Sequence, residues 1–318
     1  MIIALFSLLV FVFCSTAQND SAVGLSNASR SYGIDMESND SLIIPQMRFS
    51  DRENGSVSSL NLLRSIPIYL SGQSIIGNIQ VLQNRSEFDC SSSGLSVCIS
   101  PFSLTQFLSG LPDAASVSRV NCSSRINDIN DTNCTNSSEF QINDAKSGMY
   151  AAYLIDETDS KVIDAVPLIL TQENIVLQMP DKVLSDEPFI LVKMNTTGQG
   201  NSSKFFAAIM LSQSDYDNIS LNLSKNKSNE HIDITLCIGD RSMQVPNPPQ
   251  VSTEFLMNML PLLPQNSTIG LQESTQSGAD LILLTDKPWN RGNYILTCGV
   301  YSSEKGLLGI KQSEVRVI

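Results

Sequence analysis

The search for catalytic chemistry in this sequence centres on a single histidine. His231 is the only histidine in the 318-residue chain, so a Ser-His-Asp or Cys-His arrangement would have to use it as the general base. It stands between Glu230 and Ile232 in a polar stretch rich in asparagine, and we interpret it as a surface residue. The chain has no Gly-x-Ser-x-Gly motif, Walker loop or dinucleotide fingerprint. We therefore expect a protein that is not an enzyme and has no catalytic residues.

Three carboxylates close together offer a second kind of chemistry. Asp156, Glu157 and Asp159 could supply the acid and base of a glycoside hydrolase. A segment of Asp, Thr and Ser between two apolar runs is, however, typical of a hairpin turn, and we favour the turn.

Calcium is the one cofactor that the spacing of oxygen-bearing side chains suggests. An EF-hand loop places its ligands at fixed positions and requires Gly at its sharp turn. Asn133 stands in place of that Gly, so we expect no bound cofactor or metal, with calcium as the alternative. The residues at the ligand positions are Asp128, Asn130, Thr132, Asn136 and Glu139.

The seven cysteines point to an oxidising compartment. Cleavage of an N-terminal signal would remove Cys14 and leave six, an even number typical of a disulfide framework. We expect Cys237 to pair with Cys298, and we favour two short loops closed by Cys90–Cys98 and Cys122–Cys134. Four cysteines allow three pairings, and free buried thiols are a further alternative.

Asn-x-Ser/Thr acceptors for N-glycosylation are the strongest signal in the chain. Fifteen are present, where roughly five would arise by chance from the composition. Glycans are bulky and need exposed positions, so we predict a heavily glycosylated extracellular surface. The acceptors are Asn19, Asn27, Asn39, Asn54, Asn84, Asn121, Asn130, Asn133, Asn136, Asn195, Asn201, Asn218, Asn222, Asn226 and Asn266.

The N-terminus and the overall charge agree with export. Met1–Cys14 is an apolar run that is shorter than the ~20 residues of a membrane-spanning helix. We therefore predict a signal peptide over 1–17. Lipid attachment at Cys14 is a less favoured alternative. No second apolar stretch follows, so we expect no transmembrane segment in the mature chain. The net charge of −12 and pI near 4.5 disfavour nucleic-acid partners.

Short apolar runs separated by Gly, Asn, Asp and Ser predict an all-β protein. Residues 18–41 lack this pattern, and we expect a flexible arm there. Two short helices interrupt the strands, over 103–111 and 253–261. The predicted strands are Ile66–Leu70, Ile75–Leu82, Met149–Ile155, Val162–Leu170, Ile175–Met179, Phe189–Met194, Phe205–Leu211, Ile232–Ile238, Leu281–Thr285, Tyr294–Tyr301 and Leu307–Val317.

An internal repeat divides the chain in two. Thr105–Leu108 matches Thr253–Leu256, and Gly148-Met149-Tyr150 matches Gly292-Asn293-Tyr294. We therefore predict two similar β-sandwich domains in tandem over 42–171 and 172–318, each with one inserted helix.

A tyrosine at the start of a late strand resembles the tyrosine corner of immunoglobulin-like sandwiches. Tyr294 has this position, and its strand parity would direct Cys298 to the same side. Trp289 comes shortly before it. We expect this only tryptophan to close the core at the end of the sandwich, the alternative being an exposed stacking platform.

The segment from Trp289 to Tyr301, the ending Glu314–Val317 and the start Ser65–Leu70 resemble an uncharacterised family of extracellular proteins from methanogenic archaea. The resemblance covers about half of the chain. It implies a β-sandwich fold and a secreted or cell-surface location in an archaeon, and it carries over no catalytic residue.

These features together predict a secreted or cell-surface, N-glycosylated structural or adhesive protein. Its expected partners are cell-surface glycans or other envelope proteins. The alternative is an extracellular module that binds carbohydrate, peptide or calcium.

Overall fold

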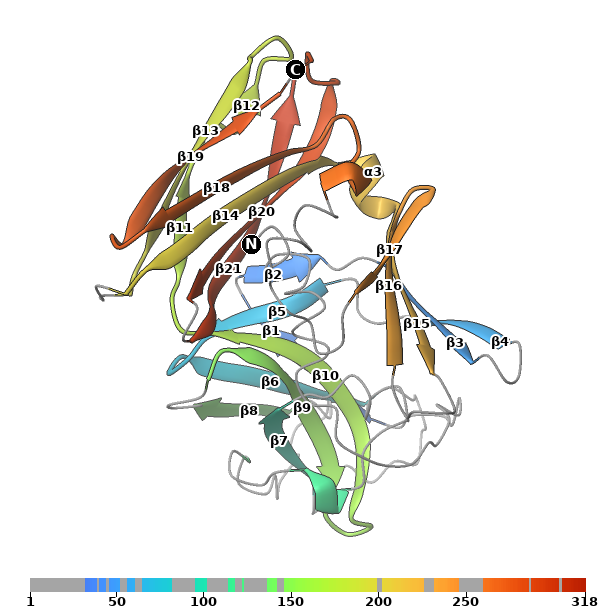
Figure 1. The fold of residues 1–318 in the computed structure, drawn as a ribbon. Helices are drawn as coiled ribbons and strands as arrows, with labels where there is room; N and C mark the ends of the chain where they lie inside the picture. Colours follow the sequence, from blue (N-terminus) through green and yellow to red (C-terminus); the bar gives the residue numbers. More distant parts are fainter. Residues whose placement is uncertain are drawn as a thin grey trace. The chain divides into compact units, whose positions relative to one another are not determined.

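β-strands make up most of the described chain, in agreement with the all-β prediction (Figure 1). The structure is a computed structural model. It describes residues 32–38, 40–43, 46–51, 56–60, 65–81, 95–101, 114–117, 122, 136–141, 146–198, 202–225, 232–245, 260–285, 287–302 and 305–318.

The chain divides into two compact units. The C-terminal unit holds Thr171–Ile318 together with Ser41–Ser65, and the N-terminal unit holds Ser15–Asp40 and Ile66–Leu170. This division groups Ser41–Ser65 with the later residues, whereas the sequence pattern predicts it in the first domain.

The N-terminal unit is a sandwich of two sheets. One sheet has the order β1 (Tyr32–Glu37), β6 (Ser74–Val81), β8 (Asn136–Gln141), and the other contains the neighbours β5 (Ser65–Leu70), β10 (Lys161–Thr171), β9 (Gly148–Asp156) and β7 (Leu95–Pro101). The core lies between them and joins Met36 and Ile75 of the first sheet to Val97, Leu154 and Leu168 of the second.

The start of this unit differs from the sequence prediction. Residues 32–37 belong to the arm expected over 18–41, but they form β1 and pair with β6 from Tyr32↔Val81 to Glu37↔Ile76. Met36 of this strand is buried in the core, and Tyr32, Ile34 and Met36 alternate with Gly33, Asp35 and Glu37 in the sequence. β2 (Asp40–Ile43) follows and crosses the division between the units.

The C-terminal unit is built around a second sandwich. Its first sheet has the order β11 (Ile175–Gln178), β13 (Phe189–Thr196), β19 (Gly278–Leu284). Its second has the order β12 (Lys182–Val183), β21 (Gly306–Val317), β20 (Gly292–Ser302), β14 (Lys204–Ser212), β18 (Thr268–Ser274). The two sheets enclose one apolar core, which includes Val192, Phe206, Leu281, Leu296 and Leu308.

The two sandwiches share a strand order. The smaller sheet has three strands in each unit, with the order β1-β6-β8 in one and β11-β13-β19 in the other. In both, the third strand of this sheet comes directly before the last two strands of the sandwich in the sequence. In both, the last two strands form an antiparallel hairpin, β9–β10 and β20–β21, and the earlier strand of that hairpin also pairs with β7 or β14.

A third sheet belongs to the C-terminal unit. Its order is β17 (Arg241–Val245), β16 (Ile232–Ile238), β15 (Ile219–Lys225), β3 (Gln46–Asp51), β4 (Ser56–Leu60), and β15 pairs with β3 in parallel. The predicted alternation is confirmed, since Ile234, Leu236 and Ile238 are buried while Asp233 and Thr235 are partly exposed.

The helices predicted over 103–111 and 253–261 lie outside the described residues, except that Leu260–Leu262 forms the 3-10 turn η3. The described helices are otherwise η1 (Ala114–Ser116) and the short α3 (Gln213–Asp217). Ser212 caps α3 by accepting a hydrogen bond from the backbone N–H of Asp215 at 3.1 Å, a standard N-cap interaction.

Candidate functional site

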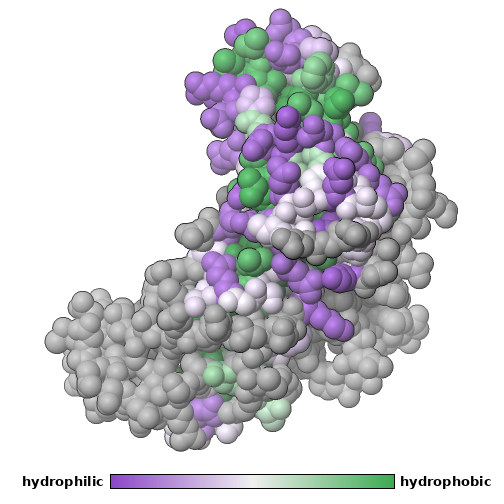
Figure 2. Space-filling view, turned by 90° about the vertical axis from the view of Figure 1, so that its left-hand side faces the viewer, coloured by the Kyte–Doolittle hydropathy of each residue, from purple (hydrophilic) through white to green (hydrophobic). Residues whose placement is uncertain are grey.

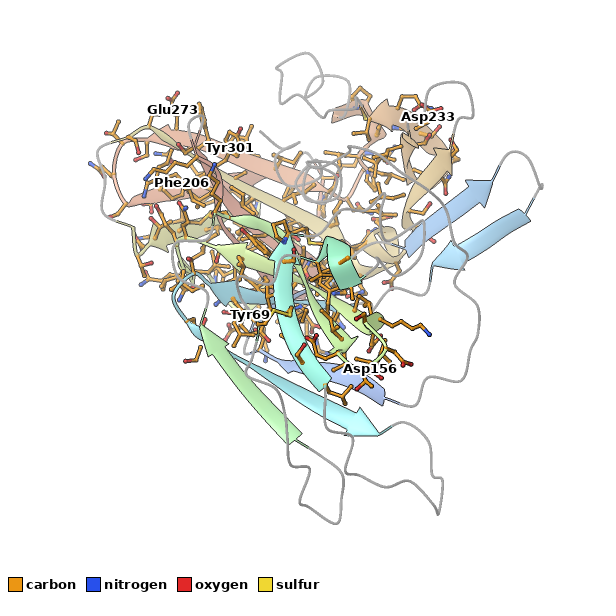
Figure 3. The ribbon with its side chains drawn as sticks, turned by 90° about the horizontal axis from the view of Figure 1, so that it is seen from below. Tyr69, Asp156, Phe206, Asp233, Glu273 and Tyr301 are labelled. Carbon is orange, nitrogen blue, oxygen red and sulfur yellow. A yellow bond between two sulfur atoms is a disulfide. The ribbon has the colours of Figure 1, made fainter. Side chains whose placement is uncertain are left out.

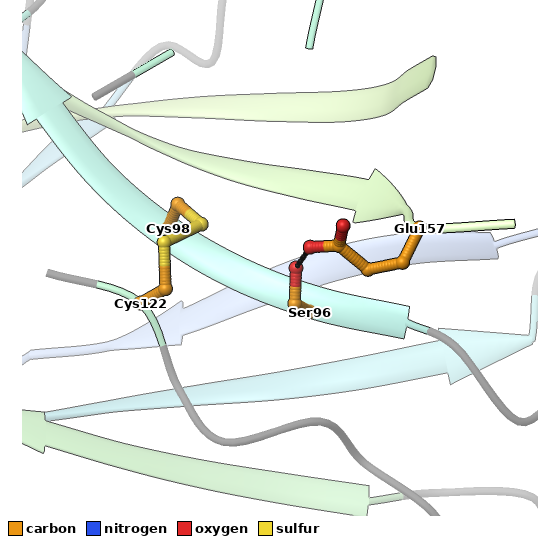
Figure 4. Close-up of a disulfide and its surroundings, with 4 residues drawn as sticks. All are labelled: Ser96, Cys98, Cys122 and Glu157. Atoms are coloured by element: carbon orange, nitrogen blue, oxygen red, sulfur yellow. Dashed lines mark hydrogen bonds between the residues drawn. A yellow bond between two sulfur atoms is a disulfide. The ribbon is translucent and has the colours of Figure 1, made fainter. Parts of the chain in front are cut away.

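The acidic segment after β9 forms a turn. Asp156, at the end of that strand (Figure 3), accepts hydrogen bonds through Oδ1 from the backbone N–H groups of Thr158 (2.8 Å) and Asp159 (3.2 Å). Ser160 completes the hairpin with a φ of 53°. Ser96 Oγ donates to Glu157 Oε1 at 2.5 Å (Figure 4). The segment is therefore the hairpin turn that we predict, in which Asp156 stabilises the turn and Glu157 joins it to β7.

Two of the five residues predicted as alternative calcium ligands lie in a β-strand. Asn136 and Glu139 lie in β8, where Asn136 pairs with Ile79 and Glu139 with Ile76. An EF-hand loop curves around its ion, and an extended strand cannot supply that curvature. Asp128, Asn130 and Thr132 lie outside the described residues, as does His231. In the part of the chain that is described, no group of three or more His, Cys, Asp or Glu side chains could hold a metal ion.

The cysteines pair differently from the predicted scheme. Cys98, buried in β7, forms a disulfide with Cys122 (Figure 4), so the pairings Cys90–Cys98 and Cys122–Cys134 are wrong in this structure. The two residues meet because Cys122 forms an isolated antiparallel bridge to the backbone of Cys98. Cys90 and Cys134 lie outside the described residues.

Cys237 and Cys298 are free thiols, which corrects the predicted Cys237–Cys298 bridge. Cys298 points into the core between the two sheets of the C-terminal sandwich, and burial raises the pKa of its thiol. Cys237 lies in the third sheet, on the side opposite Leu236 and Ile238, where Asn222 Nδ2 donates to its Sγ at 3.1 Å. The two sulfur atoms thus belong to different layers.

Five glycan acceptors lie in the described part of the chain. Asn195, on β13, and Asn218, which ends α3, are exposed, whereas Asn222 and Asn266 are partly exposed. Asn136 lies in β8. The acceptors outside the described residues are Asn19, Asn27, Asn39, Asn54, Asn84, Asn121, Asn130, Asn133, Asn201 and Asn226.

The repeated Gly-x-Tyr motif forms the same corner in both units. The hydroxyl of Tyr150 donates to the carbonyl of Lys146, and that of Tyr294 donates to the carbonyl of Asn290, each at 3.0 Å. Gly148 and Gly292 precede them with φ of 155° and 150°, conformations that a residue with a Cβ rarely adopts.

Trp289 closes the core beside the second corner, as predicted. Its side chain is buried, and its ring meets that of Tyr294 edge-on at a centroid distance of 5.8 Å. Its indole N–H donates to the carbonyl of Glu187 at 3.0 Å, which satisfies the one polar atom of the ring. The alternative of an exposed stacking platform is therefore wrong.

Sequence reasoning missed a buried ion pair in the C-terminal unit. Lys204 Nζ lies 2.9 Å from both carboxylate oxygens of Glu173, and it also contacts Thr196 Oγ1 (3.4 Å) and the carbonyl of Gly198 (3.3 Å). The carboxylate of Glu173 lies so close to the backbone of Gly198 that a Cβ on this glycine would lie 2.1 Å from it. The arrangement satisfies a buried ammonium group completely and is a structural element of the sandwich.

Sequence reasoning also missed a surface. Phe189, Leu191, Ile282 and Leu284 are large apolar residues that lie exposed on β13 and β19.

Comparisons with known proteins leave the function to be argued from these residues. No protein-family model and no curated protein matches the chain. Among solved structures it is similar to dimeric latent PorU from Porphyromonas gingivalis, at 8% identity and a TM-score of 0.23 over 88% of this chain and 20% of that chain. It is also similar to the fibronectin(III)-like modules of CbhA from Clostridium thermocellum, at 10% identity and a TM-score of 0.17 over 79% of this chain and 89% of that chain. The chain thus spans 20% of the length of the PorU chain, and TM-scores this low support no functional argument.

Proposed function

We propose that this protein is an exported, N-glycosylated structural or adhesive protein of the cell surface, without catalytic activity, and that it is built from two immunoglobulin-like sandwiches in tandem. The resemblance to extracellular proteins of methanogenic archaea suggests an archaeal cell envelope as its location.

The observation that carries this proposal is the position of the acceptor asparagines. Asn195 and Asn218 have exposed side chains at ordered places in the fold. Glycans attached there would project into solvent without displacing any part of the core, as N-glycosylation requires. The Cys98–Cys122 disulfide adds support, because disulfides persist in oxidising compartments.

The repeated architecture supports the structural role. The sandwiches share a strand order and the tyrosine corner typical of immunoglobulin-like domains. Within the described residues, Asp156 stabilises a turn, and the ion pair between Lys204 and Glu173 joins a strand to a loop. The function of such a fold depends on the surface that it presents.

None of the helices in the described residues is long and apolar enough to cross a lipid bilayer.

Site-directed changes to the acceptors test the proposal. The full chain is expressed with its leader in a host that performs N-glycosylation, and tryptic glycopeptides are analysed by mass spectrometry. We expect Asn195→Gln and Asn218→Gln each to remove one glycan from the exported protein, and Thr197→Ser, which preserves the acceptor motif, to retain it. Asn293→Gln is the matched control, because Asn293 is exposed but followed by Tyr294 and Ile295. Retention of the chain inside the cell with bare Asn195 and Asn218 would overturn the proposal.

A further inference from the structure

The strands β13 and β19 have the composition of strands that are buried on both faces. Phe189–Val192 and Leu281–Leu284 are uninterrupted apolar runs, a pattern typical of strands with no solvent-exposed side. In the structure only one side is covered. Ile190, Val192, Leu281 and Leu283 are 0–3% exposed, while the residues between them face solvent.

The solvent-facing side forms a continuous apolar patch. Phe189 pairs across the strands with Leu284, and Leu191 pairs with Ile282. The exposed fractions are 48%, 65%, 37% and 53% in that order. Figure 2 views the molecule from the side on which β13 and β19 lie in Figure 1, and hydrophobic residues appear at its surface among hydrophilic ones. Contiguous exposed apolar groups of this kind mark interaction surfaces.

A charged row borders the patch. Lys193 on β13 pairs with Asp280 on β19, and both are exposed. The next row holds the acceptor Asn195 opposite Gly278. The face therefore has two apolar rows, then one positive and one negative side chain side by side, and then a glycan acceptor.

This arrangement is complementary to itself. A two-fold axis that runs parallel to the strands, midway between β13 and β19, places β13 of one copy over β19 of a second copy. Phe189 then faces Leu284, Leu191 faces Ile282, and each Lys193 faces the Asp280 of the second copy. Sheets pack face to face at about 10 Å, a distance at which these side chains meet.

We propose that this face, defined by Phe189, Leu191, Lys193, Asp280, Ile282 and Leu284, binds a second copy of the chain and forms a symmetric dimer. A copy of the same chain is the occupant because one two-fold axis places Lys193 opposite Asp280 and also places the apolar rows opposite each other. The inference rests on the register of β13 and β19 and is independent of the proposed function.

The area of the apolar patch predicts a weak dimer. The four apolar side chains expose on the order of 400 Å², less than the roughly 800 Å² that each partner of a standard stable interface contributes. We therefore expect a dissociation constant in the micromolar range. Asn195 lies in the last row of the face, where its side chain stands against Gly278 of its own copy, so a glycan at this acceptor leaves the face at the end opposite the apolar rows.

Sedimentation velocity on the full exported chain, from about 1 to 100 µM, tests the proposal. The native protein shifts from monomer to dimer as its concentration rises. Ile282→Asp abolishes the dimer over this range. Leu271→Asp, the matched control, retains it, because Leu271 is 44% exposed on β18 and lies off the face. A native protein that stays monomeric at 100 µM, or a dimer that survives Ile282→Asp, overturns the inference.

Charge exchange identifies the symmetry. Lys193→Asp leaves two acidic side chains on each copy and Asp280→Lys leaves two basic ones, so each variant alone sediments as a monomer. Mixed in equal amounts, they form a heterodimer, since every acidic position then faces a basic one. Lys161→Asp, an exposed lysine on β10, leaves the native dimer unchanged. A mixture that stays monomeric, although both variants retain the native circular dichroism spectrum, excludes this geometry.

Discussion

The ion pair between Lys204 and Glu173 allows a quantitative test of how the C-terminal sandwich is stabilised. The side chain of Lys204 is 2% exposed and that of Glu173 is 11% exposed. Glu173→Gln removes the charge that compensates the more deeply buried ammonium group and leaves it with Thr196 Oγ1 and the carbonyl of Gly198. Removing one partner of a buried pair costs about 3–5 kcal/mol, so we expect a loss of about 3 kcal/mol in the free energy of unfolding.

The reverse change is milder. Lys204→Met leaves the carboxylate of Glu173 at the more exposed end of the pair, where water can reach it, and we expect a loss of about 2 kcal/mol. The double variant Glu173→Leu with Lys204→Met removes both charges and is expected to recover to within about 1 kcal/mol of the native protein, because apolar residues often replace a buried ion pair at little cost.

The fluorescence of Trp289 measures these changes. It is the only tryptophan in the chain and is buried in the core of the C-terminal unit, so urea unfolding followed at its emission reports on that unit. Lys161→Met, at an exposed lysine, serves as the control and leaves the midpoint unchanged. A cost below about 1 kcal/mol for Glu173→Gln, or a larger cost for Lys204→Met than for Glu173→Gln, would contradict this role of the ion pair. So would a double variant whose loss in the free energy of unfolding equals the sum of the two single losses.

Three further predictions concern separate parts of the fold. Burial raises the pKa of Tyr216 to about 12. Because the unfolded tyrosine ionises near pH 10 and the folded one does not, the free energy of unfolding falls by up to ~1.4 kcal/mol per pH unit between pH 10 and 12. Urea unfolding of Tyr216→Phe at these pH values shows a shallower decline. Replacing Cys98 and Cys122 by Ala removes a cross-link over 24 residues and lowers the melting temperature measured by circular dichroism, at a cost of about 3 kcal/mol; an unchanged melting temperature would show that the bridge does not form. Gly309→Ala places a Cβ 2.7 Å from the carbonyl oxygen of Glu173, and we expect it to destabilise the unit by about 1–3 kcal/mol in urea unfolding, a value near zero being the contrary result.

The central strands of both sandwiches could be predicted from the sequence because their apolar runs are long and local. β9 and β20 begin at the Gly-x-Tyr motif and are buried along most of their length, so the pattern alone locates them. The burial of Trp289 follows from the same local context.

Two edge strands, β1 and β18, escaped prediction, whereas the edge strands β11 and β19 were predicted. β18 (Thr268–Ser274) is largely exposed beyond Gly270, and Met36 of β1 lies in the core. Their stability comes from backbone pairing with β14 and β6, and pairing across a sheet leaves little trace in the sequence of one strand.

Features that depend on distant partners were equally out of reach. Lys204 precedes an apolar run and has the sequence context of a turn residue, and its burial depends on Glu173, which lies 31 residues away in the sequence. The choice of Cys122 as the partner of Cys98 depends on a single backbone bridge. The apolar runs Phe189–Val192 and Leu281–Leu284 were predicted only as strands, and their uncovered side, which the structure shows, is the basis of the proposed dimer.

Export and glycosylation can be tested together by mass analysis of the native protein, recovered separately from cytosol, cell envelope and culture medium. We expect a chain outside the cytosol that lacks its leader, carries glycans at Asn195 and Asn218, joins Cys98 to Cys122, and retains thiols at Cys237 and Cys298. A full-length cytosolic chain with unmodified asparagines and reduced cysteines would contradict this expectation.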